Sequence, residues 1–474
     1  MYLCTRQSGI ASRASEVVTA ASALWRQTRL MCLMLALPVM PCVLNAQTQP
    51  TEPAAAPMPA QTPAPAQEPT VAPPAALPEQ SAPAAETPGA IYKAAMRPLD
   101  VVRMSLDNWS DAELGALGVG MHKAKEACGQ SKPESYSGDD LYDLARLCSF
   151  GQDWNAANTA ALDYVAAGLD AHRAQAYALS MNALVHINAV DLAVGTAREM
   201  MRKLPYDAEV AYAVRYMKET LEQAGDPAAL TLAVQEHPAL VQALALGVPL
   251  KAAHGDAAIG VGPLYESAMQ MAFLDRYAGN DDAAAGTVAD VAGALPVDAV
   301  ITPEDKQRIN AVRTQYGLLG ARLPAIEASR SLMAATAKAQ INPDFGAATV
   351  LVLFPDWCVQ CRNMMKTLTA FVVANREVPI HAYGLMFPDE SVTGAQPSRE
   401  ANLKELRGTA TLLVPAETAA TFAALDYPLG IVVDKAGLIR FIGVVPGDAF
   451  NGDGYIEKVI TRMAAKTIGL PKTE

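Results

Sequence analysis

The chain lacks the patterns on which several large enzyme classes depend. Its 474 residues carry a net charge of −12 and no basic run, so nothing in the sequence indicates a nucleic-acid partner. There is also no glycine-rich phosphate loop, no dinucleotide-binding fingerprint and no serine–histidine catalytic signature. The sequence therefore gives no support for a nucleotide-dependent enzyme or a serine hydrolase.

Cysteine is scarce as well, with seven in the whole chain, and its placement is therefore informative. Cys358 and Cys361 form the one Cys-x-x-Cys pair. A zinc ribbon would need a second Cys or His pair at suitable spacing, and the nearby His381 stands alone. Half of a zinc site is the weaker interpretation, so we expect no metal, and we interpret His381 as a strand residue.

The surroundings of this pair are typical of a redox site. The apolar, β-branched run at residues 349–354 predicts a buried strand, and the helical spacing of apolar residues over 362–374 predicts a helix. A Cys-x-x-Cys between a strand and a helix indicates thiol–disulfide exchange. The free N–H groups at the helix start would favour the thiolate of Cys358, which attacks, and Cys361 would then resolve the mixed disulfide.

Residues 354–361, Phe-Pro-Asp-Trp-Cys-Val-Gln-Cys, resemble the active-site motif of the thioredoxin superfamily, especially its TlpA-like branch of envelope thiol–disulfide oxidoreductases. Residues 427–443 resemble the cis-proline, strand, turn and strand passage of that family. The resemblance implies that Pro428 is a cis-proline facing the cysteines and that Trp357 and Tyr427 face the substrate. The alternative for Pro428 is an ordinary proline before a strand.

The same part of the chain alternates strand and helix patterns, which predicts an α/β domain with a partly parallel sheet and helices on both faces. The strands expected between the two motifs lie at 378–387 and 411–414, and the expected helices at 400–407, 417–425 and 456–467.

Three departures from the thioredoxin pattern leave the direction of electron flow open. Val352 stands where thioredoxins carry a buried carboxylate, Lys366 stands where a proline is usual, and the dipeptide between the cysteines is Val-Gln. Proton handling could fall to one of three nearby acidic residues, each of which could equally be a solvated loop charge. These residues are Asp356, Asp389 and Glu390.

The front of the chain has the character of a targeting segment. Arg26 and Arg29 precede an apolar stretch at 30–46, so residues 1–46 are expected to be a secretory signal cleaved after Ala46, or an uncleaved signal anchor. Residues 47–90, rich in proline and alanine, are expected to be a disordered linker. We therefore expect an exported protein of the periplasm or cell envelope.

Removal of the signal would leave four cysteines, an even number that suits an oxidising compartment. Cys128 and Cys148 would then form a structural disulfide, separate from the redox pair. The alternative is two buried, reduced cysteines.

Residues 91–320 carry alanine-rich amphipathic patterns and few strand signals, which predicts a helical, repeat-like domain. One stretch resembles a tetratricopeptide repeat, with Ala176 and Tyr177 in a first helix, Ala193 in a second and Pro205 after it. Thr302 is the expected N-cap of the last helix. Such an array could bind a protein partner or serve as a spacer.

Together these patterns predict a multidomain chain in which a tetratricopeptide-like helical domain (91–320) precedes a thioredoxin-like domain (321–474). We expect an exported thiol–disulfide oxidoreductase acting on protein thiols and disulfides, without a diffusible cofactor because the dithiol is the redox group. Resemblance to TlpA-like proteins implies a reductase that draws electrons from a membrane donor. The alternatives are an oxidase or isomerase, or an interaction scaffold with a non-essential thioredoxin-like domain.

Overall fold

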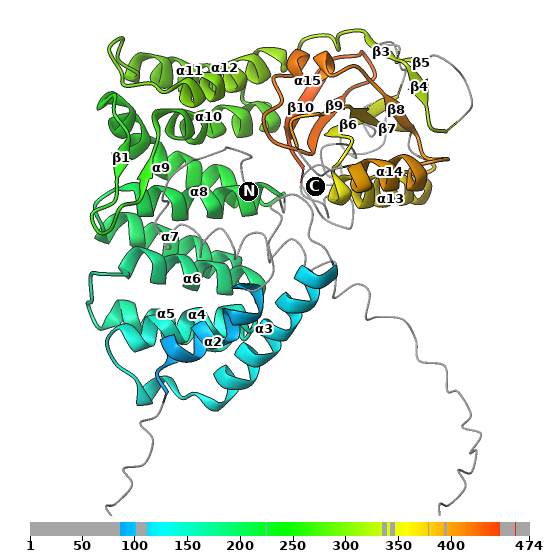
Figure 1. Cartoon of the computed structure of the whole chain (residues 1–474). Coiled ribbons are helices and arrows are strands. Elements are labelled where there is room, and N and C mark those ends of the chain that lie inside the picture. Colours follow the sequence, from blue (N-terminus) through cyan, green and yellow to red (C-terminus); the bar gives the residue numbers. More distant parts are fainter. Residues whose placement is uncertain are drawn as a thin grey trace, which may run out of the picture.

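Stacked helices form the first part of the molecule and lead into a mixed sheet (Figure 1). The computed structural model describes residues 86–100, 111–223, 225–333, 339–341, 347–377, 379–392, 396–445 and 460. The predicted signal (1–46), most of the predicted linker (47–90) and the predicted closing helix (456–467, apart from residue 460) lie outside this part of the chain. Within it, no helix combines the length and the apolar character that crossing a bilayer would require.

The helices of the first part follow one another along the chain, and most pack against their neighbours in sequence, while the last, α12, packs against α10 (Figure 1). Small residues allow this close stacking, since Ala157, Ala160 and Ala161 of one helix are fully buried. The helices are α2 (Pro88–Asp100), α3 (Asp111–Gln130), α4 (Asp139–Phe150), α5 (Trp154–Ala166), α6 (Arg173–His186), α7 (Val190–Lys203), α8 (Ala208–Gln223), α9 (Ala228–Ala245), α10 (Val261–Ala278), α11 (Asp281–Ala294) and α12 (Pro303–Leu318), with a short 3₁₀ turn at Pro133–Ser135.

The sequence predicted several of these helices correctly. Ala176 and Tyr177 lie in α6, Ala193 lies in α7, and α7 ends shortly before Pro205. Thr302 caps α12, because its hydroxyl accepts from the N–H of Asp305 while the Asp305 carboxylate accepts from the N–H of Thr302. A short hairpin between α9 and α10 was not predicted; it pairs β1 (Leu250–Lys251) with β2 (Ala258–Ile259). That the helices form a true repeat stays a prediction.

The second part is built on a six-stranded mixed sheet of order β10-β9-β6-β7-β8-β4. The central strand β6 runs parallel to β7 and antiparallel to β9. The strands are β4 (Arg330–Ser331), β6 (Ala348–Pro355), β7 (Ile380–Phe387), β8 (Thr411–Leu413), β9 (Leu429–Val433) and β10 (Ile439–Val444), and the helices are α13 (Val359–Ala374), α14 (Gln396–Glu405) and α15 (Glu417–Thr421).

Helices cover both faces of this sheet, as the sequence predicted (Figure 1). Val350, Val352 and Phe354 of β6 pack on the face of α13, with Met364 and Leu368 of that helix. The alternate residues Leu351 and Leu353 pack on the other face, with Phe422 beyond α15 and Leu319 beyond α12. All eight residues of β6 are buried, as expected of a central strand that is covered on both faces, and its sequence is a nearly continuous apolar run. Gly384 of β7 lies close to α13, where an added Cβ would meet the Met365 sulfur at 2.9 Å and the Phe354 ring at 3.1 Å.

Some element limits differ from the predicted ones. Helix α14 begins four residues before the expected start at residue 400, and α15 ends at Thr421 although residues 417–425 were expected to be helical. The helix stops because Ala423 has a φ of 46°, outside the right-handed region. A small sheet that pairs β3 (Ile326–Ala328) with β5 (Ala339–Ile341) was not predicted.

A disulfide joins Cys128, near the end of α3, to Cys148 in α4, across a sequence separation of 20 residues. Both cysteines are buried in the core that α3 and α4 share with α2 and α5. The bond therefore links two helices that already pack together, as expected of a structural disulfide.

Replacement of both residues, Cys128→Ala with Cys148→Ala, should lower the free energy of unfolding by about 3 kcal/mol, because a loop of this length is no longer closed in the unfolded chain. Urea denaturation followed by circular dichroism measures this loss. When both proteins are measured in a reducing buffer, the wild-type protein and the variant should unfold at the same urea concentration. An unchanged midpoint in oxidising buffer would contradict a stabilising disulfide.

Candidate active site

The Cys-x-x-Cys pair lies where β6 ends and α13 begins. Cys358 is the N-cap of α13, and its sulfur accepts a hydrogen bond from the N–H of Cys361 at 3.2 Å. The two cysteines are joined in a disulfide, with their Cα atoms 5.3 Å apart. Both are buried, at 1% and 0% exposure.

This position suits the chemistry of a nucleophilic sulfur. The first turn of α13 has N–H groups without helical acceptors, and it carries no acidic residue that would oppose a thiolate. The positive end of the helix dipole adds to this effect. Once the disulfide is reduced, Cys358 should therefore lose its thiol proton more readily than a cysteine in water does.

The peptide bond between Tyr427 and Pro428 is cis, as the family resemblance implied. Its place follows from the sheet register, in which Leu429 of β9 lies opposite Leu353 of β6. Because these strands are antiparallel, the residues before Leu429 lie at the same end of the sheet as the residues after Leu353. The cis bond and the disulfide thus share one end of the sheet.

The side chain of Tyr427 is held in place next to this bond. Its hydroxyl donates to the carbonyl of Ala424 at 3.1 Å, and its ring lies 5.3 Å from that of Phe387. Burial, together with the charges of Asp389 and Asp426, raises the pKa of Tyr427 to about 12, so the phenol stays protonated. Among the described residues, no partner contacts the backbone N–H or C=O of Tyr427. That Tyr427, Pro428 and Trp357 face a substrate stays a prediction.

Trp357 is anchored rather than free. Its side chain is 8% exposed and packs in the core under α13, while its indole N–H donates to a carboxylate oxygen of Asp389 at 2.8 Å. Burial acts to raise the pKa of Asp389, but hydrogen bonds from Ser391 and Trp357 and the charge of Arg399 outweigh it and hold the pKa below its usual value. Asp389 is therefore a carboxylate that positions the tryptophan.

The other acidic residues near the motif differ in their surroundings. Asp356 pairs with Arg399 of α14 at 3.0 Å, and the same guanidinium donates to the carbonyl of Asp389. Glu390 is exposed. Of the three acidic residues considered for proton handling, Asp356 lies in the loop between β6 and α13 (residues 356–358, the active-site loop), Asp389 contacts this loop through Trp357, and Glu390 faces solvent.

Asn402 was missed in the sequence-based predictions, although its side chain contacts the backbone on either side of Trp357. Its amide donates to the carbonyl of Asp356 at 2.9 Å and to that of Cys358 at 3.1 Å, in a fully buried position. Arg399, Asn402 and Glu405 lie at intervals of three residues on α14, so they share one face of the helix. This spacing could have indicated that the three residues share a face, but the helix predicted from the sequence, 400–407, did not include Arg399.

The structure shows the surroundings of two of the three positions that depart from the thioredoxin pattern, Val352 and Lys366. Val352 is fully buried in the apolar core beneath α13. Because it is a valine, this position has no ionisable group. Lys366 lies on α13 and pairs with Glu405 at 3.1 Å, and Arg362 pairs with the same carboxylate at 3.0 Å. The hydrogen bond from Lys366 and the charge of Arg362 lower the pKa of Glu405.

His381 lies in β7 with an exposed side chain, in line with its interpretation as a strand residue. No group of three metal-ligating side chains gathers anywhere in the described ranges.

Comparison with solved structures finds matches that each cover about 30% of the chain. A thioredoxin domain of a thiol-disulfide oxidoreductase from Bacteroides vulgatus is 18% identical, covering 30% of this chain and 97% of that one, with a TM-score of 0.24. A secreted thiol-disulfide isomerase from Corynebacterium glutamicum is also 18% identical, covering 31% and 85%, with a TM-score of 0.24.

A thioredoxin-family thiol:disulfide interchange protein from Chlorobium tepidum is 13% identical, covering 30% and 97%, with a TM-score of 0.22. No family model and no curated protein matches the chain. Two features that the family resemblance implied are present in the structure: the Cys-x-x-Cys at the start of α13 and the cis bond before Pro428 at the same end of the sheet.

Substitution Asn402→Ala should destabilise the protein by about 2 kcal/mol, because two buried carbonyls lose their donor. It should also raise the rate at which iodoacetamide modifies reduced Cys358, since the loop is held less firmly. The matched control is Asn375→Ala, which removes a similar amide-to-carbonyl bond, to Phe371, at the far end of α13. Equal effects of the two substitutions on the modification rate would contradict a role for Asn402 in the active-site loop.

The bond between Trp357 and Asp389 should depend on pH. Because the pKa of Asp389 is lowered in the folded protein, its carboxylate stabilises the fold above the ordinary carboxyl range, and the contribution is lost as the pH falls through the lowered value. The indole N–H resonance of Trp357 in an NMR titration should move with this transition. It should stay still in Asp389→Asn and still move in Glu390→Gln. Movement in Asp389→Asn would show that another group is responsible.

Proposed function

We propose that this protein is an exported thiol–disulfide oxidoreductase that reduces disulfides in proteins through Cys358 and Cys361. The carrying observation is the Cys-x-x-Cys pair at the N-terminus of α13, at the same end of the sheet as the cis bond before Pro428. A thiolate at a helix start is the group that attacks disulfides. A scaffold alone would need neither sulfur.

The reaction runs in two exchange steps. The Cys358 thiolate attacks one sulfur of the substrate disulfide, forms a mixed disulfide and releases the other substrate sulfur as a thiolate. Cys361 then loses its proton and attacks the Cys358 sulfur, which forms the Cys358–Cys361 bond and releases the second substrate sulfur. Two electrons pass to the substrate, and an external dithiol must return them before the next cycle.

The backbone of Tyr427 gives the substrate a place to bind. An extended peptide can add to an unpaired backbone segment by strand-like hydrogen bonds. The backbone N–H and C=O of Tyr427, which form no hydrogen bond with any described residue, lie beside the cis bond at the end of the sheet that carries the cysteines. We therefore infer that a protein segment carrying the disulfide lies along Tyr427 while Cys358 attacks.

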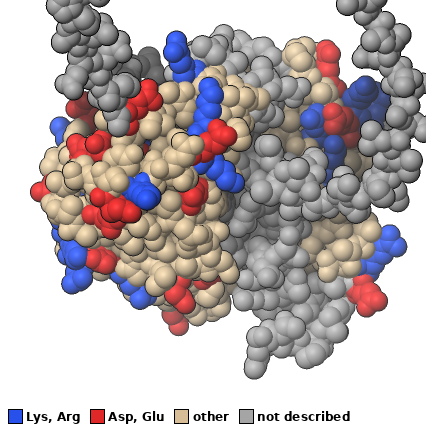
Figure 2. All heavy atoms as spheres, turned by 90° about the horizontal axis from the view of Figure 1, so that it is seen from below, with Lys and Arg blue, Asp and Glu red and all other residues tan. Residues whose placement is uncertain are grey.

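The surface charge that is described gives no support for a nucleic-acid substrate. On the described part of the face in Figure 2, acidic and basic side chains are interspersed and do not form a basic stripe. A membrane-bound electron donor and export from the cytoplasm belong to the proposal, the first from the TlpA-like resemblance and the second from the N-terminal sequence pattern. The helical part would bind a protein partner.

An oxidase or isomerase is the alternative within the same chemistry, since direction depends on the reduction potential. Equilibration of the Cys358–Cys361 pair in a glutathione redox series, followed by alkylation and mass spectrometry, measures it. A reductase should give a value of about −270 mV, and an oxidase one of about −120 mV. The absence of any reversible two-electron couple would refute the proposed chemistry.

A trapping variant tests the substrate class. Cys361→Ala should accumulate mixed disulfides with proteins through Cys358, because the resolving sulfur is gone. The control, Cys358→Ala with Cys361→Ala, should capture none. If Cys361→Ala also captured no protein, the scaffold alternative would be favoured.

A further inference from the structure

Helix α12 of the helical part lies against the segment that leads into the cis bond, residues 422–427. Gln315 of α12 donates from its amide to the carbonyls of Phe422, at 3.4 Å, and Ala423, at 3.0 Å. Two turns earlier on the same helix, Arg308 pairs with Asp426 at 3.4 Å. One helix therefore holds this segment at both of its ends.

The contact with Asp426 is buried and charged. The side chain of Arg308 is 8% exposed and that of Asp426 is 9% exposed. Asp426 immediately precedes Tyr427, so the pair ends one residue from the backbone groups that we propose to bind substrate. A shift of Asp426 would move Tyr427 with it, because consecutive residues share a rigid peptide plane.

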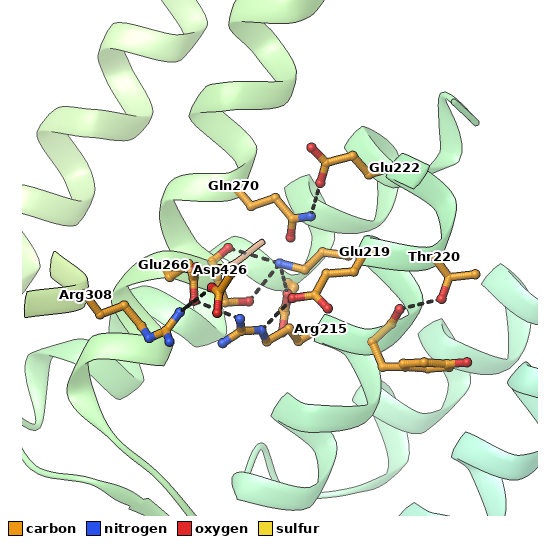
Figure 3. A network of polar contacts seen from close by, with 12 residues as sticks. Arg215, Glu219, Thr220, Glu222, Glu266, Gln270, Arg308 and Asp426 are labelled. Atoms are coloured by element: carbon orange, nitrogen blue, oxygen red, sulfur yellow. Dashed lines mark hydrogen bonds and ion pairs between the residues drawn. The ribbon is translucent and has the colours of Figure 1, made fainter. Parts of the chain in front are cut away.

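The arginine is in turn fixed from the helical side. Glu266 of α10 accepts from Arg308 at 2.9 Å and from Arg215 of α8 at 2.8 Å, and Arg215 also donates to Glu219 at 2.8 Å (Figure 3). Three helices of the array thus meet at one carboxylate. These contacts orient the Arg308 guanidinium toward Asp426, and this orientation does not depend on a bound substrate.

The surroundings of the network leave room for movement. A cavity of about 140 Å³ lies between these helices and strands β9 and β10, lined in part by Arg308, Asp426 and Leu429. Burial and the charge of Glu266 raise the pKa of Asp426 above its usual value although Arg308 opposes them, so its charge depends on the arginine. Loss of the arginine would leave a buried carboxylate beside open space, and the loop would relax.

We propose that Arg308 and Gln315 are positioning residues for substrate binding, through which the helical part holds the Tyr427–Pro428 backbone in its binding position. The proposal rests on the proposed function, since it concerns how that site receives a protein disulfide. Neither residue touches the cysteines or the substrate. They act through Asp426 and through the carbonyls of Phe422 and Ala423.

The test compares a protein disulfide with a small one. Full-length variants are assayed for reduction of insulin, which offers a backbone to Tyr427, and of hydroxyethyl disulfide, which has none. Arg308→Gln should raise the KM for insulin by about tenfold with little change in kcat. The rate with hydroxyethyl disulfide and the reduction potential of the Cys358–Cys361 pair should stay at their wild-type values. Gln315→Ala should give a smaller rise in the same KM.

The matched control is Arg313→Gln, the same change on the same helix. Arg313 is exposed and contacts Tyr265 within the helical part, not the loop. It should keep the wild-type KM for insulin. The double variant Arg308→Gln with Asp426→Asn should be no worse than Arg308→Gln alone, because both changes break the same contact. Circular dichroism confirms that each variant is folded, and Gln315→Ala, half-buried at the edge of the contact, serves if Arg308→Gln does not fold.

Two results would overturn the inference while the proposed function stands. In the first, the wild-type protein reduces insulin and both Arg308→Gln and Gln315→Ala keep its KM. In the second, the variants lose activity equally toward insulin and hydroxyethyl disulfide, which would indicate general damage to the redox part. A wild-type protein that reduces neither compound would instead refute the proposed function, and the inference with it.

Discussion

The burial of β6 on both faces is the constraint on which the rest of the second part depends. Because each face of the strand packs into its own core, its register with β7 and β9 is fixed along its whole length. The end of β6 then sets where Cys358 begins α13, and its antiparallel partner β9 sets where Pro428 lies. A single strand thus brings together two features that are about seventy residues apart in sequence.

Polar contacts from α14 hold the active-site loop. Beneath the disulfide, Val352 places an apolar side chain and no charge. Asn402 fixes the backbone at Asp356 and Cys358, and Arg399 fixes the side chain of Asp356. In this arrangement the environment of the sulfurs is apolar below and hydrogen-bonded around the loop. On the proposed function, the balance between these two effects sets the reduction potential and with it the direction of electron flow.

Long apolar elements could be predicted from the sequence, whereas most short or polar ones could not; the three-residue β8, expected at 411–414, is an exception. The run at 349–354 and the helical spacing after Cys361 indicated β6 and α13 because burial alone decides such segments. The two- and three-residue strands β1 to β5 carry no periodic pattern, and only tertiary pairing defines them. Asn402 looks like any surface residue of a helix. The contact of Arg308 with Asp426 joins residues 118 positions apart, and no local pattern could indicate it.

The central claim is that one of the two disulfides is the working pair and the other is structural. All four cysteines are buried, so their positions distinguish the two pairs: Cys358 and Cys361 lie at the N-terminus of α13, where free N–H groups favour a thiolate, whereas Cys128–Cys148 joins α3 to α4 within the helical core. Mild reduction with dithiothreitol, then alkylation and peptide mass spectrometry of the folded protein, tests this directly. The account predicts labels on Cys358 and Cys361 while Cys128 and Cys148 stay bonded. Labelling of Cys128 and Cys148 first, or of all four cysteines together, would contradict it.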